Sequence, residues 1–564
     1  MVKRILKLFH SECSGLHKAA VLLGLSSLAS SVLALFRDRL LAGTFGAGKE
    51  LDLYYAAFRV PDFVYVLSIT VIAITVLIPM ILERAENDGK EKTKEFLDGV
   101  LTVFVVIMFV FLGIAFFAMP WIAKIIAPGF SEAEQIKLVL LSRILLLSPF
   151  FMGLSNLFSS IVQSYKRFYI MALSPILYNL GIIIGIVFFC PVFGLKGLIF
   201  GVVLGAFAHF FIKIPTSASL GLLPKITKKV NFREVFSIIK LSLPRAFGLS
   251  LNQIVLIFIT AAASSLAVGS LSVFNLSYNL ESLPLAIIGV SYSIAAFPTL
   301  SKFFVSNNKE EFFRHIVIAA RQIIFWLVPA SVSLIVLRAQ IVRVLFGYGN
   351  FDWTDTRLTA AALAVFSVAI TAQALVTLFV RAFYAAGKTA RPVMINVFAN
   401  MVIISLLFVL PSFFRSNLWF KDFIEKALRV DGLGKETSIL MLPLAFAIGM
   451  ILDASLLMFF FRKTIGWTES VNRKIFKGFS KVLSSSVFMG VVMYFFLNIL
   501  DNIFDIQTVV GITLQGVLAG IIGATVWFTV LYLSKNQELL EVLSSLRQKF
   551  WQEDTVVAEA EKLP

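Results

Sequence analysis

Residues 36–62 read FRDRLLAGTFGAGKELDLYYAAFRVPD, and they join two apolar segments that are each long enough to cross a membrane. Five of the charged side chains in this stretch lie at membrane depth: Arg37, Asp38, Arg39, Asp52 and Arg59. A charge in hydrocarbon costs about 3 kcal/mol or more, so such side chains face a partner or a water-filled cavity. The stretch therefore predicts a polar cavity between membrane helices.

The composition sets the class of protein. The chain has 564 residues, of which 59% are hydrophobic and 15% charged, and its mean hydropathy is +0.90. Apolar runs of about 20 residues recur along it, which predicts an all-α polytopic membrane protein. The net charge of +17 comes from Lys and Arg gathered in short loops, so it indicates membrane topology and no nucleic acid partner.

The length and apolar content of the runs predict about 14 membrane helices. They cover residues 20–44, 53–83, 97–119, 135–161, 169–190, 194–214, 236–266, 270–300, 314–337, 356–386, 391–412, 438–462, 478–499 and 508–533. The second, seventh, eighth and tenth are long for a simple span, so we expect them to tilt or to project beyond the bilayer.

The loops between these helices predict the orientation of the chain. Connections rich in Lys and Arg alternate with connections that are poor in both, and basic connections face the cytoplasm. Both termini are therefore expected in the cytoplasm. Two outer loops break this pattern, and the one from Arg415 to Lys435 is expected to hold a short interfacial helix, since it contains Trp419 and Phe420.

An internal repeat runs through the chain. Pairs of landmark residues are separated by 221 positions: Phe130 and Phe351, Arg167 and Lys388, and Asn179 and Asn400. The offset spans six helices, an even number, so the two halves share one orientation. We therefore predict two parallel six-helix lobes followed by two added C-terminal helices. The fourth and tenth helices open with capping signals: Ser131 with Glu134, and Asp352 with Asp355.

The predicted organisation has five parts: an amphipathic cytoplasmic segment (1–19), an N-lobe of helices 1–6 (20–220), a C-lobe of helices 7–12 (221–475), helices 13–14 (476–534) and a cytoplasmic tail (535–564). In the tail, apolar residues recur at helical spacing: Leu539, Leu543, Leu546 and Phe550. This spacing predicts an amphipathic helix that rests on the membrane or on the protein, with a partner-binding motif as the alternative.

Two parallel lobes around a central cavity are typical of an alternating-access transporter, with the substrate bound where helices 1, 2, 7 and 8 meet. Four arginines give this region an excess of positive charge: Arg37, Arg39, Arg59 and Arg245. Arginine binds phosphate bidentately, so the pattern favours an anionic, phosphate-bearing substrate. A structural alternative remains open. Arg37 would then only lock helices through an ion pair with Asp38 or Asp52, and Arg39 would snorkel to the surface.

The residues point away from an enzyme. The two cysteines, Cys13 and Cys190, and the four histidines form no metal-ligand spacing, and no Ser/His/Asp set or Gly-x-x-x-x-Gly-Lys-Ser/Thr nucleotide loop occurs. We therefore expect a transporter without a cofactor. Uphill transport would be driven by the membrane potential or by the gradient of an ion that the sequence does not identify. Asp453, in the twelfth expected helix, is a weak candidate for binding a coupling cation.

The opening stretch resembles the start of the MurJ (MviN) lipid II flippases, a family of the multidrug/oligosaccharidyl-lipid/polysaccharide (MOP) exporter superfamily. LFGYGNFDWTDTRLTA (345–360), SYKRF (164–168) and AAGKTARP (385–392) are similar to further segments of that family. The resemblance implies two six-helix lobes, with a terminal helix pair that lines a groove for a lipid tail. It implies movement of lipid II, the undecaprenyl-pyrophosphate-linked disaccharide-pentapeptide, to the outer leaflet of the bacterial cytoplasmic membrane for cell-wall peptidoglycan biosynthesis. We expect a monomer among membrane lipids.

The same resemblance implies which residues line or support the cavity: Arg37, Asp38, Asp52 and Arg59. Three positions depart from the family, which commonly has arginine where this chain has Ser31, Tyr65 and Asn279. An acidic residue that is usual in the second helix is also replaced, near Thr70. Asn279 stays a candidate for substrate binding, and Arg245 is a hypothetical source of compensating charge.

Three alternatives remain open from the sequence. The nearest is a flippase for another polyprenyl-linked oligosaccharide, such as an O-antigen unit. A cation-coupled drug exporter of the same superfamily would need acidic and aromatic residues in the cavity. A non-transporting membrane scaffold would account for the missing arginines.

Overall fold

The computed structural model describes residues 16–72, 74–433, 436–467, 469–505 and 508–551. Within these ranges the chain is helical, with no strand. Ten helices in the described part are long and apolar enough to cross a membrane, or 11 if one bent pair counts as a single span. Helices also cover the three other expected ranges, 20–44, 53–83 and 236–266, so the arrangement is consistent with the 14 predicted spans.

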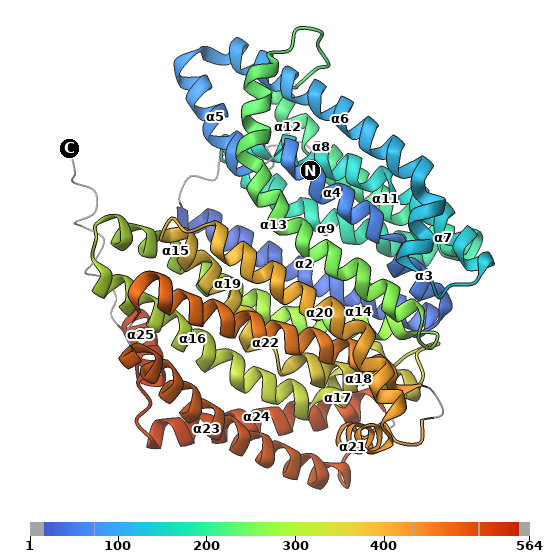
Figure 1. Cartoon of the computed structure of the whole chain (residues 1–564), viewed down its shortest axis with the longest axis vertical. Coiled ribbons are helices and arrows are strands. Elements are labelled where there is room, and N and C mark those ends of the chain that lie inside the picture. Colours follow the sequence, from blue (N-terminus) through green and yellow to red (C-terminus); the bar gives the residue numbers. More distant parts are fainter. Residues whose placement is uncertain (1–15, 73, 434–435, 468, 506–507, 552–564) are drawn as a thin grey trace.

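The helices fall into three groups (Figure 1). The N-terminal bundle comprises α2 (Leu16–Phe45), α3 (Lys49–Ala57), α4 (Arg59–Val71), α5 (Ile74–Asn87), α6 (Gly89–Ile126), α7 (Glu132–Leu145), α8 (Leu147–Ser164), α9 (Phe168–Ile184), η1 (Gly185–Phe189), α10 (Cys190–Phe193), α11 (Leu195–Phe211) and α12 (Ile214–Ser219).

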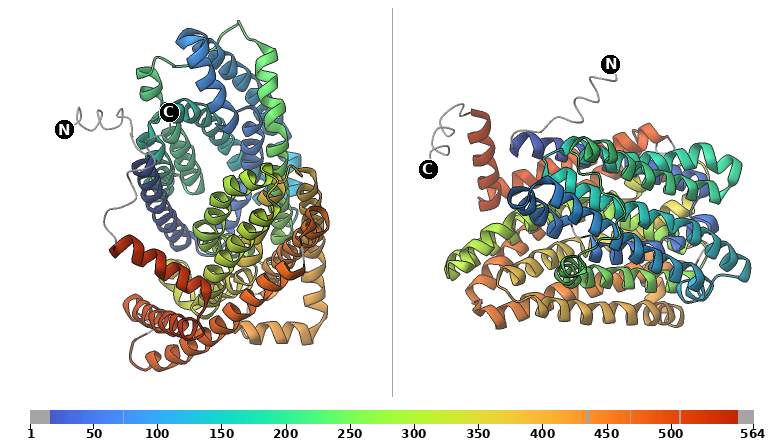
Figure 2. Two further views of the ribbon diagram at one scale, coloured as in Figure 1. Left: turned by 90° about the vertical axis from the view of Figure 1, so that its left-hand side faces the viewer. Right: turned by 90° about the horizontal axis from the view of Figure 1, so that it is seen from above.

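The C-terminal bundle comprises α13 (Phe232–Ser264), α14 (Ser270–Pro284), η2 (Leu285–Val290), α15 (Ser291–Val305), α16 (Lys309–Val336), α17 (Arg338–Phe346), α18 (Trp353–Ser367), α19 (Ile370–Ala385), α20 (Ala390–Ser416), α21 (Leu418–Leu428), η3 (Thr437–Leu440), α22 (Met441–Phe461) and η4 (Arg462–Gly466). The third group is α23 (Glu469–Asp501), α24 (Val509–Leu533) and α25 (Gln537–Trp551). Figure 2 shows α23 and α24 on the side of the C-terminal bundle that faces away from the N-terminal bundle.

The internal repeat is visible in the backbone at the predicted offset. Ser131 begins α7 with a capping box, and its backbone N–H donates to Glu134 Oε2 at 2.7 Å. Asp352, 221 residues later, caps α18 and accepts from the Asp355 N–H at 2.7 Å, so both predicted caps are confirmed. Each of these helices then breaks at a corresponding place, α7 into α8 and α18 into α19 with a bend of 42°. The two halves therefore share local geometry as well as sequence.

Three of the four long helices contain an irregular segment or a break, and the expectation that they tilt or project beyond the bilayer stays a prediction. The second expected span is divided into α3, α4 and α5, and Pro61 lies in the first turn of α4, where its missing N–H costs nothing. The eighth runs from α14 into the π-helix η2 directly after Pro284, and the tenth is the α18/α19 pair. Only α13 is continuous, with 33 residues. Such breaks position side chains that a straight helix would turn elsewhere.

Glycines bring α9 and α11 into close contact. Gly181 and Gly185 face Gly201 and Gly205, each pair spaced by four residues, and a Cβ added at Gly185 would lie 2.7 Å from the Gly201 Cα. Small residues at this spacing allow membrane helices to approach backbone to backbone. The contact fixes α9, which carries Asn179 and its neighbours into the centre of the molecule.

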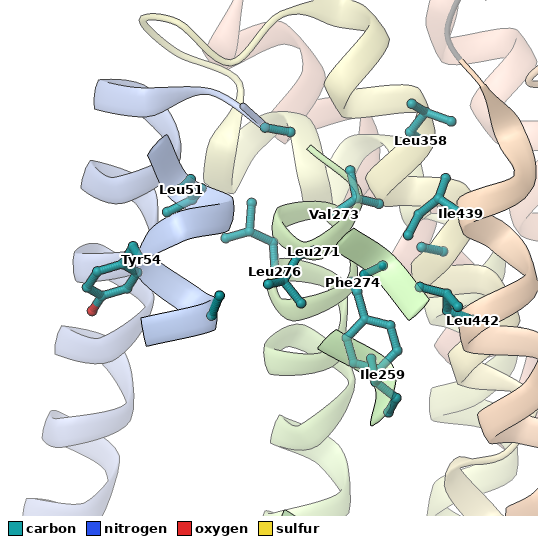
Figure 3. Packing of buried hydrophobic residues seen from close by; sticks show 14 of the residues in the cluster. Leu51, Tyr54, Ile259, Leu271, Val273, Phe274, Leu276, Leu358, Ile439 and Leu442 are labelled. Atoms are coloured by element: carbon teal, nitrogen blue, oxygen red, sulfur yellow. The ribbon is translucent and has the colours of Figure 1, made fainter. Parts of the chain in front are cut away.

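The two bundles share a hydrophobic core. Figure 3 shows Leu51 of α3 on the side toward Leu271 and Leu276 of α14, whereas the ring of Tyr54 points away from α14. All four residues belong to one hydrophobic cluster with residues of α18 and α22. The long helix α13 packs against α4 and α6 of the N-terminal bundle and against α20 of its own bundle. The bundles are therefore joined along α13 and at the end of the molecule that carries α3.

The structure shows helices in two peripheral segments where the sequence predicted them. The loop after α20 holds the short helix α21, whose Trp419 is 76% exposed. The tail forms α25, and Leu539 is buried while Glu538 pairs with Arg321 of α16, so this helix rests on the protein. The amphipathic segment expected before residue 16, and the side chains of Leu546 and Phe550, lie outside the described residues.

Candidate substrate site between the two bundles

A cavity of about 260 Å³ lies between the bundles. Its lining comes from α2, α3, α4 and α9 on one side and from α13 and α14 on the other: Arg37, Asp38, Leu41, Tyr54, Tyr55, Phe58, Arg59, Asp62, Tyr178, Ile182, Leu256, Asn275, Tyr278 and Asn279. The structure thus brings together Arg37, Asp38, Arg59 and Asn279 from the predicted set.

Arg37 and Asp38 form the centre of a chain of hydrogen bonds. The Arg37 guanidinium donates to Asp38 Oδ1 from Nη2 at 2.7 Å and from Nε at 2.9 Å, and to Asn179 Oδ1 at 2.9 Å. The other carboxylate oxygen of Asp38 accepts from Asn279 Nδ2 at 3.0 Å. The chain runs from α9 through α2 to α14, so it crosses from one bundle to the other.

Arg59 reaches across the same interface from α4. Its Nε donates to Thr260 Oγ1 on α13 at 2.7 Å, and its Nη2 donates to Asn275 Oδ1 on α14 at 3.0 Å. Only 5% of this residue is exposed. These partners are neutral, and no salt bridge reaches Arg59 from the described residues. The guanidinium is therefore a buried cation whose charge lies beside the cavity without a bonded anion.

Four tyrosines complete the lining. Tyr54 and Tyr55 follow one another on α3 with ring centroids 5.3 Å apart, and Tyr178 and Tyr278 enter from α9 and α14. The rings present apolar faces and polar tips, which suits a ligand with both kinds of surface. Sequence reasoning missed these tyrosines, and it also missed Asp62, although Asp62 ends the RVPD motif in the opening stretch.

The charge of the described lining differs from the expectation. It holds two arginines, Arg37 and Arg59, and two aspartates, Asp38 and Asp62, so it carries no excess of positive charge. Arg39 lies elsewhere and donates to the carbonyls of Val344 and Leu345 on α17. Arg245 belongs to α13 by its backbone, but its side chain is outside the described residues, and its compensating role stays a prediction.

Asp52 lies outside the cavity and caps α14. Its Oδ2 accepts from the Gly269 N–H at 2.7 Å, and its Oδ1 accepts from the N–H and the hydroxyl of Ser272 at 2.7 and 2.6 Å. A carboxylate at the first turn of a helix satisfies free N–H groups and favours the helix dipole. A role for Asp52 in substrate binding remains a prediction.

Two further contacts join the bundles at the same end. Asp355 Oδ2 of α18 accepts from the Ala47 N–H at 2.9 Å, and the Asn350 N–H donates to the Gly43 carbonyl at 2.8 Å. Gly43 lies close to Tyr348, and a Cβ added at Gly43 would collide with the tyrosine ring unless the ring moved. We call these two contacts and the Asp52 cap the clamp. The clamp holds the FGAG turn (45–48) against α18 and the loop before it.

Three positions were noted in the sequence because the similar family commonly has arginine there, and the structure places only one of them, Asn279, in the cavity lining. Asn279 lies in the cavity and holds Asp38. The hydroxyl of Tyr65 accepts from Asn156 Nδ2 at 3.3 Å, and neither Tyr65 nor Ser31 lines the cavity. The side chain of Thr70 lies outside the described residues.

Asp453 is buried inside the C-terminal bundle, away from the cavity lining. With the Asn396 amide turned to satisfy its neighbours, the amide nitrogen donates to Asp453 Oδ1 at 3.1 Å and to the Pro392 carbonyl at 3.0 Å. Across the described residues, no group of three or more His, Cys, Asp or Glu side chains is arranged to hold a metal ion.

The fold is the one found in solved transporters of the MOP superfamily. The structure matches an inward-facing MATE multidrug transporter of that superfamily with a TM-score of 0.61 at 14% identity, covering 81% of this chain and 99% of that one. It matches a structure of the lipid II flippase MurJ in an inward closed conformation with a TM-score of 0.71 at 23% identity, covering 91% of this chain and all of that one.

The family follows from the sequence comparisons. The model of the family described as lipid II flippase MurJ matches residues 41–515. A "Probable lipid II flippase MurJ" of Buchnera aphidicola subsp. Schizaphis graminum is 32% identical over 389 residues, covering 67% of this chain and 75% of that protein. The lipid II flippase MurJ of Burkholderia cenocepacia is 27% identical over 379 residues, covering 66% and 73%. This chain belongs to the MurJ lipid II flippase family, whose members are membrane transporters and not enzymes.

Proposed function

We propose that this chain moves lipid II from the inner to the outer leaflet of the bacterial cytoplasmic membrane, where it supplies peptidoglycan biosynthesis. Family membership supports this function and favours it over the drug exporter and the scaffold that the sequence left open. The observation that carries the proposal is the placement of Arg59, a buried cation with neutral partners beside the cavity at the interface of the bundles.

The diphosphate of lipid II is the group that this site would hold. A buried guanidinium without a bonded anion gains most from an anionic ligand, because the ligand replaces the hydration that burial has removed. Arg37 would join it by exchanging the carboxylate of Asp38 for a phosphate oxygen. Asp38 would then keep its bond from Asn279, so the carboxylate would not be left without a partner.

The size of the cavity limits what enters it. Its volume of about 260 Å³ is close to the lower limit for small-molecule pockets, which run from about 300 to 1,000 Å³. The diphosphate and an adjoining sugar suit this volume, whereas the complete head group needs the bundles to separate. The prenyl tail would stay in lipid, which spares it from water and spares the head group from hydrocarbon.

We further propose that both termini are cytoplasmic, because the basic loops support that topology. The clamp then closes the cavity toward the outside, and its opening would release the head group to the outer leaflet. In this scheme the chain acts as a monomer. The membrane potential or an ion gradient drives net movement, without a bound cofactor.

Genetic complementation tests the function and the site together. The native lipid II flippase of a bacterium is depleted while this chain, or a variant with Arg37→Ala and Arg59→Ala, is expressed to the same level in the membrane. Arg39→Ala is the matched control, since Arg39 bonds α17 and does not line the cavity. We expect rescue by the wild type and by the control, and no rescue by the double variant.

The other outcomes separate the two parts of the proposal. Rescue by the double variant would leave the function standing and remove the site. Failure of a well-expressed, membrane-inserted wild-type chain would contradict lipid II transport. Binding of purified protein to a different polyprenyl-linked saccharide would then identify the alternative substrate.

A further inference from the structure

One carboxyl group beside the cavity has no role in the site described above. Glu281 lies on α14, one helical turn after Tyr278, and it is 0% exposed. Its Oε1 accepts a hydrogen bond from Gln373 Nε2 on α19, and its Oε2 is buried without a hydrogen-bond partner. Tyr278 lines the cavity and Glu281 itself does not, so Glu281 lies three residues along α14 from a residue of the cavity wall.

The surroundings of Glu281 disfavour its charged form. No lysine, arginine or histidine of the described chain forms an ion pair with it, and its bonded partner is a neutral amide. A fully buried carboxylate with one orphaned oxygen lacks both the cation and the hydrogen bonds that stabilise buried charges. The protonated carboxyl group is uncharged, so it can be buried without a nearby cation and with fewer hydrogen bonds than a carboxylate.

Charged groups on the elements around α14 are engaged elsewhere or lie far along their helices. Five of these groups form hydrogen bonds or ion pairs with other residues. Asp52 accepts from the first turn of α14, and Asp355 accepts from the Ala47 N–H. Arg357 donates to the Arg429 carbonyl, Arg59 donates to Thr260 and Asn275, and Arg321 pairs with Glu538. Arg381 follows Gln373 by eight residues, which is about 12 Å along α19. The charged residues at the start of α13 lie in its first three turns: Arg233, Glu234 and Lys240. The Arg245 side chain is not described.

The hydrogen bond between Glu281 and Gln373 joins two places where helices are interrupted. Pro284 follows Glu281 by three residues, and the π-helix η2 begins at the next residue. Gln373 lies in the first turn of α19, directly after the 42° bend that separates α19 from α18. Irregular helical segments of this kind are where a membrane helix can change its path at low cost.

We propose that Glu281 is a proton-binding site whose occupancy is coupled to the movement of the bundles. In the arrangement described here, Glu281 is protonated and its carbonyl oxygen accepts from Gln373. When α14 and η2 rearrange and water reaches the carboxyl group, the O–H bond breaks and the proton passes to that water. The carboxylate must be reprotonated before it returns to the buried position, so one proton is taken up and one released in each cycle.

The inference identifies the proton as the coupling ion of the proposed transport, and in that part it rests on the proposed function. The protonation state of Glu281 is testable without any transport. Infrared spectroscopy of the full chain in lipid detects the carbonyl band of a protonated carboxylic acid, which ionised carboxylates lack. We expect this band at neutral pH in the wild type and its loss in Glu281→Gln, which keeps the shape of the neutral acid.

Asp453→Asn is the matched control, because Asp453 is a buried carboxyl group of the same bundle outside the cavity lining. A band that is unchanged in Glu281→Gln would show that Glu281 carries no proton and would overturn the proposal. Thermal unfolding of both variants checks that they are folded. Gln373→Leu provides a second test, because it removes the amide that donates a hydrogen bond to Glu281. The carbonyl band of protonated Glu281 should remain in this variant but shift in frequency.

The coupling is measured in proteoliposomes as the ratio of lipid II movement with and without an imposed pH gradient. The ratio cancels any change in the basal rate of a variant. We expect a ratio above unity for the wild type and a ratio of unity for Glu281→Gln. An equal response in both proteins would overturn the coupling. No movement by the wild type under any condition would contradict the proposed function instead, while the infrared result would still decide the proton site.

Discussion

The guanidinium of Arg59 on α4 lies 3.0 Å from the amide oxygen of Asn275 on α14, so a single side chain joins the two bundles across the central cavity. The same guanidinium donates to Thr260 on α13. An arginine can satisfy two partners on different helices because its donors are arranged in a planar fork. Arg59 thus combines a structural role with a charge that faces the cavity, and the two roles can be separated by substitution.

Arg59→Lys should lower the rate of lipid II movement at least about tenfold, which corresponds to about 1.4 kcal/mol. Lysine keeps the charge but has no fork that reaches Thr260 and Asn275 together. The measurement is head-group transfer in proteoliposomes, with Arg39→Lys as the control. A wild-type rate in Arg59→Lys would show that the charge alone is sufficient.

Asn279→Asp should abolish rescue in the complementation assay. The Asn279 amide donates to Asp38 at 3.0 Å, and an aspartate there would place two carboxylates face to face in a partly buried site. Like charges at this separation push the bundles apart and free Arg37 from its place. Asn279→Gln keeps a donor and serves as the control. If Asn279→Asp rescued growth as well as Asn279→Gln, the bond between Asp38 and Asn279 would have no part in transport.

Asp52→Asn should reduce the free energy of unfolding by about 1 to 2 kcal/mol, because it weakens the cap on α14. An amide oxygen can accept from Gly269 or from Ser272, but it lacks the charge that favours the helix dipole. A double-mutant cycle with Ser272→Ala measures the interaction by thermal unfolding. Glu50→Gln on the same helix is the control, since Glu50 is exposed. Additive effects in the cycle would show that the bond from the Ser272 hydroxyl to Asp52 contributes no stability.

Gly201→Val should destabilise the protein by about 1 to 3 kcal/mol, the usual cost of overpacking. Any side chain at Gly201 meets the backbone at Gly181 of α9 and at Gly185, the first residue of η1, so α11 must move away from this segment. Separation would also displace Asn179 from Arg37. The control is Gly113→Val on α6, where an added Cβ meets nothing within 4 Å. Equal melting temperatures for the two variants would refute the glycine contact.

Much of the site was predictable from the opening stretch, and the errors have identifiable causes. Charges in apolar segments correctly placed Arg37, Asp38 and Arg59 around a cavity, because hydrocarbon leaves such groups no other environment. The same rule could not show that Asp52 lies outside the cavity. Asp52 binds the first turn of α14 instead, beginning with Gly269, which is 217 residues away in the chain. The rule also could not place Arg39, whose partners are carbonyls on α17. Carbonyls and N–H groups of a helix end carry no signature in the sequence of a distant segment.

The sequence by itself determined the helical class, the repeat and the presence of a polar centre. Each of these follows from local rules. Apolar segments of this length cross a bilayer as helices, because a helix satisfies its own backbone hydrogen bonds, and the thickness of the bilayer sets the length of each helix. A charged side chain without a partner is disfavoured in the hydrocarbon. Only the tertiary structure decided which charged residues share the cavity, that Asp62 and four tyrosines complete it, and that Glu281 is buried beside it with Gln373. These placements depend on the angle at which each interrupted helix packs against its neighbours. That angle is set by contacts between residues far apart in the chain, so the pattern of any one segment does not contain it.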